Sequence, residues 1–480
     1  MAEHELEAVI GLEIHVQLST RTKMFCGCEL SFGDEPNVHT CPVCLAHPGV
    51  LPVTNEEAIR YALKIAAALE CEVAPRSIFA RKNYFYPDNP KAYQISQYDL
   101  PLAVNGRLGG IRIHRAHLEE DAAKTIHVGE SGRIHGSGAS LVDFNRGGTP
   151  LVEIVTEPDL RSAAEAGAWA RLLRTTVRQL GVSDVNMEEG SLRVDANVSV
   201  RPAGSEALGT KTELKNMNSF RFLERGVEAE LARQRELIEA GGRVEQETLH
   251  FDPADGALHP LRSKEEAHDY RYFPEPDLVP LAPSEAMLRE ARESLPELPE
   301  ARMRRYEDEL GLSAENAAQL AGDPEEAAYF EAVCERAAGT EAQTVANWVT
   351  GELAAALRQA DGASPGDSKV TPEALAALIA MVGEKRVSHG SGKQVLAALV
   401  AEGGDPAAIV EREGLAQIAD SGELEAIVAA AVEANPDAAE QIRAGNQKAI
   451  GAIVGAVMKE TKGRADGGEV NRLIKQQLGA

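Results

Sequence analysis

The sequence has no uninterrupted apolar run of about 18 residues, the length that a membrane-spanning helix requires. Its first seven residues are largely acidic and carry no apolar segment of a secretory signal, so we expect a cytoplasmic protein. Two catalytic motifs are missing as well. Gly390-Ser-Gly-Lys393 resembles part of a P-loop, but Val387 and Gln394 stand where that motif needs glycine and a hydroxyl residue. No G-x-S-x-G nucleophile elbow occurs.

Positive charge is scarce: the formal net charge is −26, which argues against a general polyanion binder. Residues 441–480 are an exception, because they hold seven cations against three acids. A basic end on an acidic protein is typical of a local nucleic-acid contact, and it is equally compatible with a solvated helix face. Composition alone leaves both interpretations open.

Aromatic residues make up only 4% of the chain, yet five of them fall within residues 81–98. Amides, cations and two prolines separate them, and the prolines exclude a continuous helix. Flat rings beside amide and cationic side chains suit a pocket for a polar, planar group. The alternative is a rigid loop packed on its domain.

Cysteine is rare, but four of the six cysteines cluster as Cys26-Gly-Cys28 and Cys41-Pro-Val-Cys44. Disulfides are disfavoured in the cytosol, and two close thiolate pairs at the ends of a short loop can close a tetrahedral zinc site. Four protein ligands leave no position for a substrate, so we expect a structural zinc. Cys71 and Cys334 stand alone in helical patterns, where small core residues are expected.

Residues 10–18 and 191–201 alternate strictly between apolar and polar side chains, as half-buried strands do. Helical patterns occupy residues 56–69, 163–180 and 220–240. Because no regular βαβ spacing is present, this order favours an α+β fold with a largely antiparallel sheet.

A proline-rich tract at residues 273–299 follows, and the chain beyond it is rich in Ala, Glu and Leu with helical patterning. We therefore expect three domains. They are a mixed domain at residues 1–294, an all-α helical domain at residues 295–405 and a small helical tail domain at residues 406–480.

Acidic residues recur in and beside the predicted strands. Glu13 and His15 share one strand face, and Glu153 interrupts an apolar run. A further acidic group occupies residues 119–121, shortly after His117. Carboxylates contributed by several strands suit Mg²⁺ and phosphate chemistry, whereas any one of them alone is more simply a solvated charge.

Residues 145–150, Asn-Arg-Gly-Gly-Thr-Pro, could offer backbone amides and a guanidinium to a phosphate, although a simple turn explains them in isolation. Lys82 and Arg193 are further candidates for neutralising phosphate charge. The candidate nucleotide-binding residues are Arg146, Gly147, Gly148, Arg193 and Asp195.

Seven segments together resemble the B subunits of tRNA-dependent amidotransferases: residues 10–18, 81–97, 117–121, 145–155, 187–199, 211–220 and 269–280. These motifs are long, and the resemblance covers essentially the whole chain. It implies that the first domain is a catalytic cradle with a core like that of glutamine synthetase. It also implies that a helical domain follows and that the tail embraces tRNA.

The resemblance further implies an enzyme, a carbon–nitrogen ligase that takes its amide nitrogen from glutamine and works within a heterotrimer. With ATP and Mg²⁺, such a protein phosphorylates the side-chain carboxylate of Glu-tRNA(Gln) or Asp-tRNA(Asn). Ammonia from a glutaminase A subunit then displaces the phosphate, and a small C subunit completes the assembly.

Three groups of site residues are implied by the resemblance. The Mg²⁺ set is Glu13, His15, Glu120 and Glu153, with Lys82 as a further catalytic residue. The structural zinc would be held by Cys26, Cys28, Cys41 and Cys44, a set that only some family members have. The tail residues expected to contact tRNA are Lys459, Lys462 and Arg464.

Two alternatives belong to other functional classes. A zinc-stabilised scaffold could bind tRNA without catalysis. A free-standing ligase could amidate a small metabolite without tRNA or partner subunits.

Overall fold

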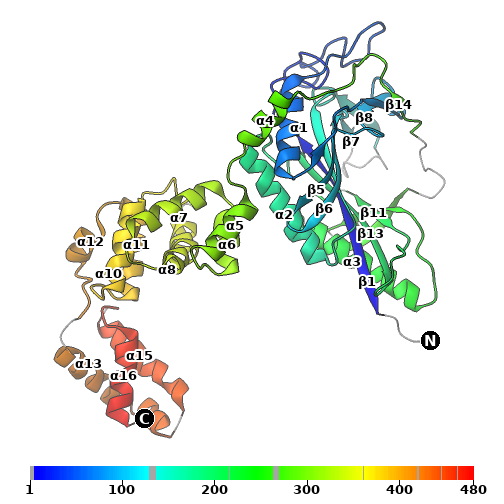
Figure 1. Cartoon of the computed structure of the whole chain (residues 1–480). Helices are drawn as coiled ribbons and strands as arrows, with labels where there is room; N and C mark the ends of the chain where they lie inside the picture. Colours follow the sequence, from blue (N-terminus) through cyan, green and yellow to red (C-terminus); the bar gives the residue numbers. More distant parts are fainter. Residues whose placement is uncertain are drawn as a thin grey trace. The chain divides into compact units, whose positions relative to one another are not determined.

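The computed structural model describes residues 5–128, 137–215, 217–253, 255–262, 270–360, 362–418, 421–444, 446–461 and 463–479. The chain forms two compact units, Met1–Leu298 and Pro299–Ala480. The first unit mixes strands and helices, and the second is helical (Figure 1). The predicted α+β class with a largely antiparallel sheet is confirmed.

A nine-stranded sheet runs through the described part of the first unit in the order β13-β12-β11-β10-β1-β9-β6-β5-β2. Its neighbours pair antiparallel, except that β11 and β12 are parallel. The strands are β1 (Leu6–Gln17), β2 (Glu72–Val73), β5 (Ala103–Leu108), β6 (Ile111–Glu120), β9 (Pro150–Thr156), β10 (Leu192–Pro202), β11 (Thr212–Lys215), β12 (Thr248–Asp252) and β13 (Ala257–Arg262).

Strand β1 shows why the two faces of this sheet differ. Ile10, Leu12 and Ile14 are fully buried, while Glu13 and His15 alternate with them and point to the opposite face. The apolar face packs against a layer of helices, seen in Figure 1 as α1 (Glu56–Ala68), α2 (Ala163–Leu180) and α3 (Phe220–Glu239). The opposite face carries the polar side chains that form the candidate site.

The three helices begin where the sequence provides a cap. The side chains of Asn55, Ser162 and Ser219 each accept a hydrogen bond from the first helical turn. Helix α2 ends at Gly181, whose φ of 68° suits glycine. These local signals explain why the strands and helices predicted in this unit are all present, although β1 begins already at Leu6.

Two small sheets complete the described part of the first unit. The first consists of β14 (Phe273–Pro274), β3 (Ala80–Asn83) and β4 (Tyr93–Ser96), and the second of β7 (Lys124–Val128) and β8 (Ala139–Asp143). The aromatic segment of residues 81–98 is therefore a hairpin, with Lys82 opposite Gln94. Phe85 at its tip is exposed. Helix α4 (Glu285–Glu293) packs against α1.

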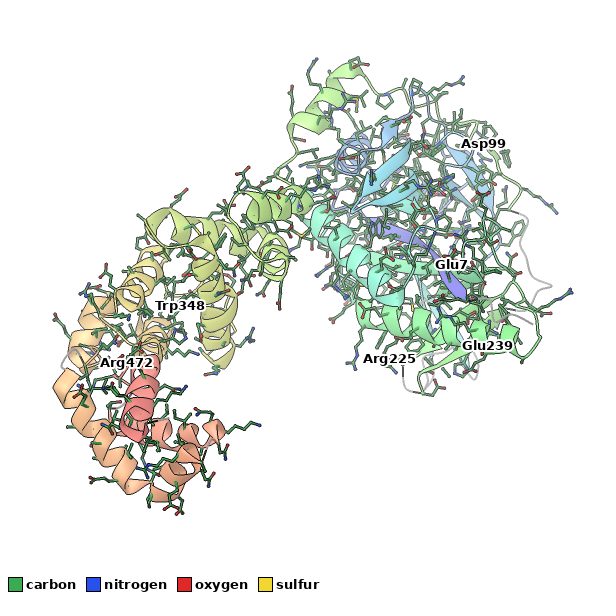
Figure 2. The ribbon with its side chains drawn as sticks, turned by 60° about the horizontal axis from the view of Figure 1, so that its bottom comes forward. Glu7, Asp99, Arg225, Glu239, Trp348 and Arg472 are labelled. Carbon is green, nitrogen blue, oxygen red and sulfur yellow. The ribbon has the colours of Figure 1, made fainter. Side chains whose placement is uncertain are left out.

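The second unit contains two apolar clusters, one around Phe330 and Val349 and the other around Val428 and Ile453. Figure 2 shows Trp348 among its helices. The elements are α5 (Pro299–Asp308), α6 (Ala314–Ala321), α7 (Pro324–Arg336), α8 (Ala342–Asn347), the π-helix η2 (Trp348–Leu353), α9 (Ala354–Ala360), α10 (Pro372–Gly383), α11 (His389–Glu402), α12 (Pro406–Glu413), α13 (Ser421–Ala434), α14 (Pro436–Arg443), the 3₁₀-helix η3 (Gln447–Ala449), α15 (Ile450–Glu460) and α16 (Gly467–Leu478).

None of the helices in the described residues is long and apolar enough to cross a membrane. The expected cytoplasmic location stays a prediction. So does the division into three domains after residues 294 and 405.

A fully buried carboxylate on α3 yields a test of this packing. Glu230 accepts hydrogen bonds from Thr212 Oγ1, Gln234 Nε2 and Arg233 Nε, each 2.7 Å long. Glu230→Ala should lower the free energy of unfolding by about 2 kcal/mol, because Thr212 and Gln234 lose their shortest acceptor and keep only longer hydrogen bonds of 3.0–3.3 Å. Urea unfolding followed by Trp169 fluorescence in a Trp348→Phe background reports on this unit.

The matched control is Glu236→Ala, an exposed position on the same helix. Equal stability of the two variants would contradict a structural role for the Glu230 network.

Candidate active site and cysteine cluster

The polar face of the central sheet carries a row of ionisable side chains on four neighbouring strands. His15 on β1 lies opposite Arg193 on β10 and opposite Glu153 on β9. Glu153 lies in turn opposite His117 on β6. Directly opposed residues of antiparallel strands point to the same face, so pairing alone gathers these four side chains.

Three ionisable groups on this face, His15, Glu119 and Glu153, converge closely enough to hold one cation. His15 Nε2 lies 3.2 Å from Glu119 Oε1 and 3.5 Å from Glu153 Oε2. His117 Nε2 lies 3.4 Å from the same oxygen of Glu153. One ligand atom from each of His15, Glu119 and Glu153 falls within 4.8 Å of the others. An imidazole and two carboxylates fit a hard divalent ion.

Charge within this cluster is balanced by His15. Burial alone would lower the pKa of His15, but its contacts with Glu119 and Glu153 outweigh burial and raise that pKa to about 10. Burial would raise the pKa of Glu153, but the charges of His117 and His15 hold that pKa below its usual value. A cation that entered this cluster would need an unprotonated imidazole, so it would take the place of a proton.

Glu120, which the resemblance placed in the Mg²⁺ set, lies outside this cluster. Its neighbour Glu119 points toward His15, while the Glu120 carboxylate accepts hydrogen bonds from the Lys91 ammonium and from Ile95 N (2.9 Å). Gln94 Nε2 also donates to the Glu120 carbonyl over 2.7 Å. The structure thus ties Glu120 to strand β4 and its preceding loop, and its role as a metal ligand stays a prediction.

Glu13 and Asp195 form the next row along the same two strands. Glu13 Oε1 accepts a hydrogen bond from Asn197 Nδ2 at 2.8 Å, and Lys215 Nζ lies 3.2 Å from Asp195 Oδ2. Both carboxylates share the polar face with His15, but neither belongs to the three-residue cluster. They extend the acidic strip along β1 and β10.

Two guanidinium groups meet at Asp121. Arg146 Nε donates to Asp121 Oδ2 over 2.6 Å, and Arg193 Nη2 donates to Asp121 Oδ1 over 3.0 Å. Their charges outweigh burial and hold the pKa of Asp121 below its usual value. Arg146 Nη2 and Arg193 Nε are buried without a partner among the described residues. Buried donors of this kind suit an anionic group.

The backbone amides expected to hold a phosphate are already used. Gly147 N donates to the Phe144 carbonyl over 3.1 Å, and Gly148 N donates to the Asp121 carbonyl over 2.9 Å. Gly148 has a φ of 89°, which favours glycine, and a Cβ there would meet the Lys23 side chain at 3.4 Å. These glycines therefore shape the turn that carries Arg146.

Lys82 connects the aromatic hairpin with the acidic cluster. Its Nζ lies 4.9 Å from the centre of the Tyr270 ring. Burial would lower the pKa of Lys82, but the charge of Glu119, followed by Tyr272 and Glu153, outweighs burial and raises it. Tyr98 stacks on Tyr272 with ring centres 4.3 Å apart. The hairpin thus supplies a cation, and Tyr270 and Tyr272 supply aromatic rings beside it.

The four clustered cysteines also converge. Cys44 Sγ lies 4.0 Å from Cys28 Sγ and 3.9 Å from Cys41 Sγ, and all four sulfurs fall within 4.8 Å of one another. Thiolates of a tetrahedral zinc site are roughly 3.8 Å apart, so the four sulfurs fit this ion. The hydrogen bond from Cys26 and the charge of Lys23 lower the pKa of Cys44 to about 4. The cluster could hold a metal such as zinc.

Residues 26–44, which carry the four cysteines and which we call the cysteine loop, are joined to the turn that carries Arg146. His39 N donates to Asn145 Oδ1 and Asn145 Nδ2 donates to the Glu35 carbonyl, both over 2.8 Å. Phe144 N donates to Asn37 Oδ1, also over 2.8 Å. A continuous set of hydrogen bonds therefore runs from the cysteine loop to the residue before Arg146.

The predicted tRNA contacts lie in the second unit. Lys459 is exposed at the end of α15, and Arg464 is half-buried, with its Nε donating to the Thr461 carbonyl over 3.1 Å. Lys462 lies outside the described residues.

The sequence indicated residues 119–121 as a candidate acidic group but assigned no separate role to Glu119 or Asp121, and it did not single out Lys91, Tyr270 or Tyr272. Alternation along β6 places Glu119 and His117 on one face, a signal that was available. Asp121 and the tyrosines carry no local signal, because their partners lie far away along the chain.

Family models and similar relatives match almost the whole chain. The family model described as the GatB/GatE catalytic domain matches residues 8–289, and the one described as the GatB domain matches residues 328–478. Similar relatives are named as B subunits of aspartyl/glutamyl-tRNA(Asn/Gln) amidotransferases. That of Moorella thermoacetica is 51% identical over 482 residues, covering 99% of this chain and 100% of the relative. That of Geobacter sulfurreducens is 50% identical over 480 residues, covering 98% and 99%.

Metal content tests the cysteine cluster. Purified wild-type protein should contain one zinc ion per chain, and Cys41→Ser should lose it, because three thiolates bind the ion less tightly than four. Elemental analysis of the gel-filtered protein measures this directly. Cys334→Ser, a cysteine outside the cluster, is the matched control and should keep the metal. Zinc retained in Cys41→Ser would remove this thiolate from the site.

Proposed function

The chain belongs to the family of aspartyl/glutamyl-tRNA(Asn/Gln) amidotransferase B subunits, and from this premise we propose that it activates the side-chain carboxylate of a misacylated tRNA. The substrates are Glu-tRNA(Gln), Asp-tRNA(Asn) or both. ATP phosphorylates the carboxylate, and ammonia then displaces the phosphate to give Gln-tRNA(Gln) or Asn-tRNA(Asn). The chain is thus one component of a carbon–nitrogen ligase whose amide nitrogen comes from glutamine.

The chemistry needs three things that the polar face offers. A carboxylate is a poor electrophile, and phosphorylation turns one of its oxygens into a leaving group. Charge that develops on the phosphates must be offset, and the acyl phosphate must be shielded from water. Cations, a cluster of candidate metal ligands and an aromatic wall lie together on this face.

The observation that carries the proposal is the convergence of His15, Glu119 and Glu153. These residues would hold Mg²⁺, which neutralises phosphate charge when bound. Glu13 lies one row away on the same face, and Glu120 adjoins Glu119 in sequence. Both stay in the proposed set as expected from the family resemblance.

Arg146 and Arg193 are proposed to bind the ATP phosphates. Support comes from their unpartnered buried nitrogens and from Asp121, which holds both guanidiniums side by side. Lys82 would face the carboxylate that becomes phosphorylated, because the charges of Glu119 and Glu153 both raise its pKa and so place its ammonium near the acidic cluster. The aromatic hairpin would exclude water from that position.

We further propose that ammonia arrives from a glutaminase A subunit and that a small C subunit completes the heterotrimer. The relatives are named as B subunits of an amidotransferase, which supports the existence of partner subunits. The tail, with Lys459, Lys462 and Arg464, would contact tRNA through its backbone phosphates.

Glu119→Gln tests the catalytic role. In the assembled enzyme it should reduce ATP- and tRNA-dependent phosphate release on the order of 100-fold, because a charge that holds the cation is lost while the side-chain shape is kept. The glutaminase activity of the partner should be unchanged. Glu228→Gln, an exposed position on α3, is the matched control.

Full amide formation by Glu119→Gln would support a non-catalytic scaffold instead. Activity of the purified chain on a small acid, without tRNA or partners, would support a free-standing ligase. A parallel Mg²⁺ titration of Glu120→Gln decides the remaining assignment: a raised Mg²⁺ requirement supports direct ligation, and an unchanged one removes Glu120 from the metal set.

The tail predicts a salt effect. Lys459→Gln combined with Arg464→Gln should weaken tRNA binding and reduce the slope of log affinity against log salt concentration by about 1 to 2, since each phosphate contact contributes slightly less than 1. Filter binding at several salt concentrations measures both quantities. Arg289→Gln, an exposed cation on α4, serves as control. An unchanged slope would exclude these two side chains from the tRNA surface.

A further inference from the structure

The second unit contains a cavity that no residue of the candidate active site lines. Its volume is about 630 Å³, and it lies between η2, the end of α10 and the start of α11. Trp348, labelled in Figure 2 among these helices, forms part of its wall together with Asn347, Glu352, Ile379 and His389. This volume is in the range of ligand sites, and we call it the Trp348 cavity.

The wall of the Trp348 cavity includes a fixed aromatic ring. Trp348 and Ile379 are almost fully buried, so they belong to the core as well as to the cavity wall. A Cβ added to Gly392 would approach Trp348 Cη2 to 3.2 Å, which shows how closely α11 packs on the indole. His389 contacts the indole edge-on, with ring centres 5.3 Å apart. The indole is therefore held from two sides.

The polar group of the cavity is Glu352. His389 Nε2 lies 3.2 Å and Lys393 Nζ 2.9 Å from Glu352 Oε1. Both contacts fall on Oε1, so neither of these side chains occupies Oε2. Burial would raise the pKa of Glu352, but Lys393 and His389 outweigh burial and hold that pKa below its usual value. The cavity thus offers a carboxylate acceptor on a half-buried side chain.

A π-helical turn places the indole and the carboxylate together. Residues Trp348–Leu353 form η2 between α8 and α9. A π-helix has a wider turn than an α-helix and is uncommon, and such turns are frequent at functional sites. Trp348 and Glu352, four positions apart on this segment, line the same cavity.

Two cations directly follow the wall residues Gly383 and Glu384 in the sequence. Lys385 and Arg386 follow α10 and are exposed, and Lys393 lies beside Glu352. Glu384 is also on the rim and pairs with Arg386 at 3.7 Å. The tail segment contacts the start of α11, because the hydroxyls of Ser388 and Ser391 donate to the Gly463 carbonyl.

We propose that the Trp348 cavity binds an unpaired nucleobase of the tRNA substrate. The base would lie against the buried wall of Trp348 and Ile379 and give an amino or imino N–H to Glu352. Its flanking phosphates would face the exposed Lys385 and Arg386. Every nucleobase has such a donor, and base pairing occupies it. The cavity therefore selects a position in the RNA where the base is unpaired and unstacked. This inference rests on the proposed function, which supplies tRNA as the ligand.

Fluorescence tests occupancy, because the chain has only two tryptophans. In full-length Trp169→Phe protein, Trp348 is the single reporter. Deacylated tRNA(Gln) transcript should quench it saturably. Glu352→Gln should weaken tRNA binding about 10-fold, the scale of one lost base contact, without changing the salt slope. Filter binding with Trp169 intact measures the same affinity independently.

Gly383→Leu fills the cavity without touching the ion pairs, because a Cβ at Gly383 meets open space. It should weaken tRNA binding as Glu352→Gln does. Gly351→Leu is the matched control, since this exposed glycine on the same π-helix also has open space and lies outside the wall. It should bind tRNA normally.

The outcomes distinguish failure of the cavity proposal from failure of the proposed function. If wild-type protein binds no tRNA, the proposed function fails. If it binds tRNA while Glu352→Gln and Gly383→Leu bind equally well and Trp348 is not quenched, the cavity proposal is overturned alone. A separate titration uses the four nucleoside monophosphates GMP, AMP, CMP and UMP. Weak binding of one of them identifies the base. Binding as tight as that of tRNA would make the cavity a free-nucleotide site and overturn the proposal.

Discussion

The pairing of β1 with its two neighbours is the constraint on which the candidate site depends. Register places His15 opposite both Glu153 and Arg193. A slip by one residue would turn the polar side chains of β1 into the core and expose Leu12 and Ile14. Each buried aliphatic side chain contributes roughly 1.5–3 kcal/mol, so the slipped register is strongly disfavoured. The hydrophobic core thereby decides which ionisable groups meet.

Buried charge imposes a second constraint. Glu119, Asp121 and Glu153 are nearly inaccessible, and such carboxylates are costly to bury without partners. His15 pairs with Glu119 and Glu153, while Arg146 and Arg193 form ion pairs with Asp121. Two guanidiniums repel each other, and Asp121 holds them together before any ligand binds. Their remaining donors are therefore already arranged for an anion, which lowers the reorganisation that binding requires.

The elements could be predicted from the sequence because their signals are local. Alternation identified β1 and β10, and helical patterning identified α1, α2 and α3. Alternation also indicates that Glu119 and Glu120 point to opposite sides, but it cannot say which of them joins His15. That depends on the pairing of His117 with Glu153. Likewise, Tyr270 approaches Lys82 only because the chain returns to β3 through β14.

The cysteine loop supports the site without contributing a group to it. Residues 142–145 lead from β8 into the turn of Arg146, and backbone groups in such irregular segments need partners. Asn37 provides them for Val142 O and Phe144 N, while Glu35 and His39 bond the side-chain amide of Asn145. Beyond the turn, Met24 N donates to the Gly148 carbonyl, so the chain just before Cys26 supports the other side. A metal that orders this loop therefore acts on the position of Arg146 through hydrogen bonds, at a distance from the carboxylates.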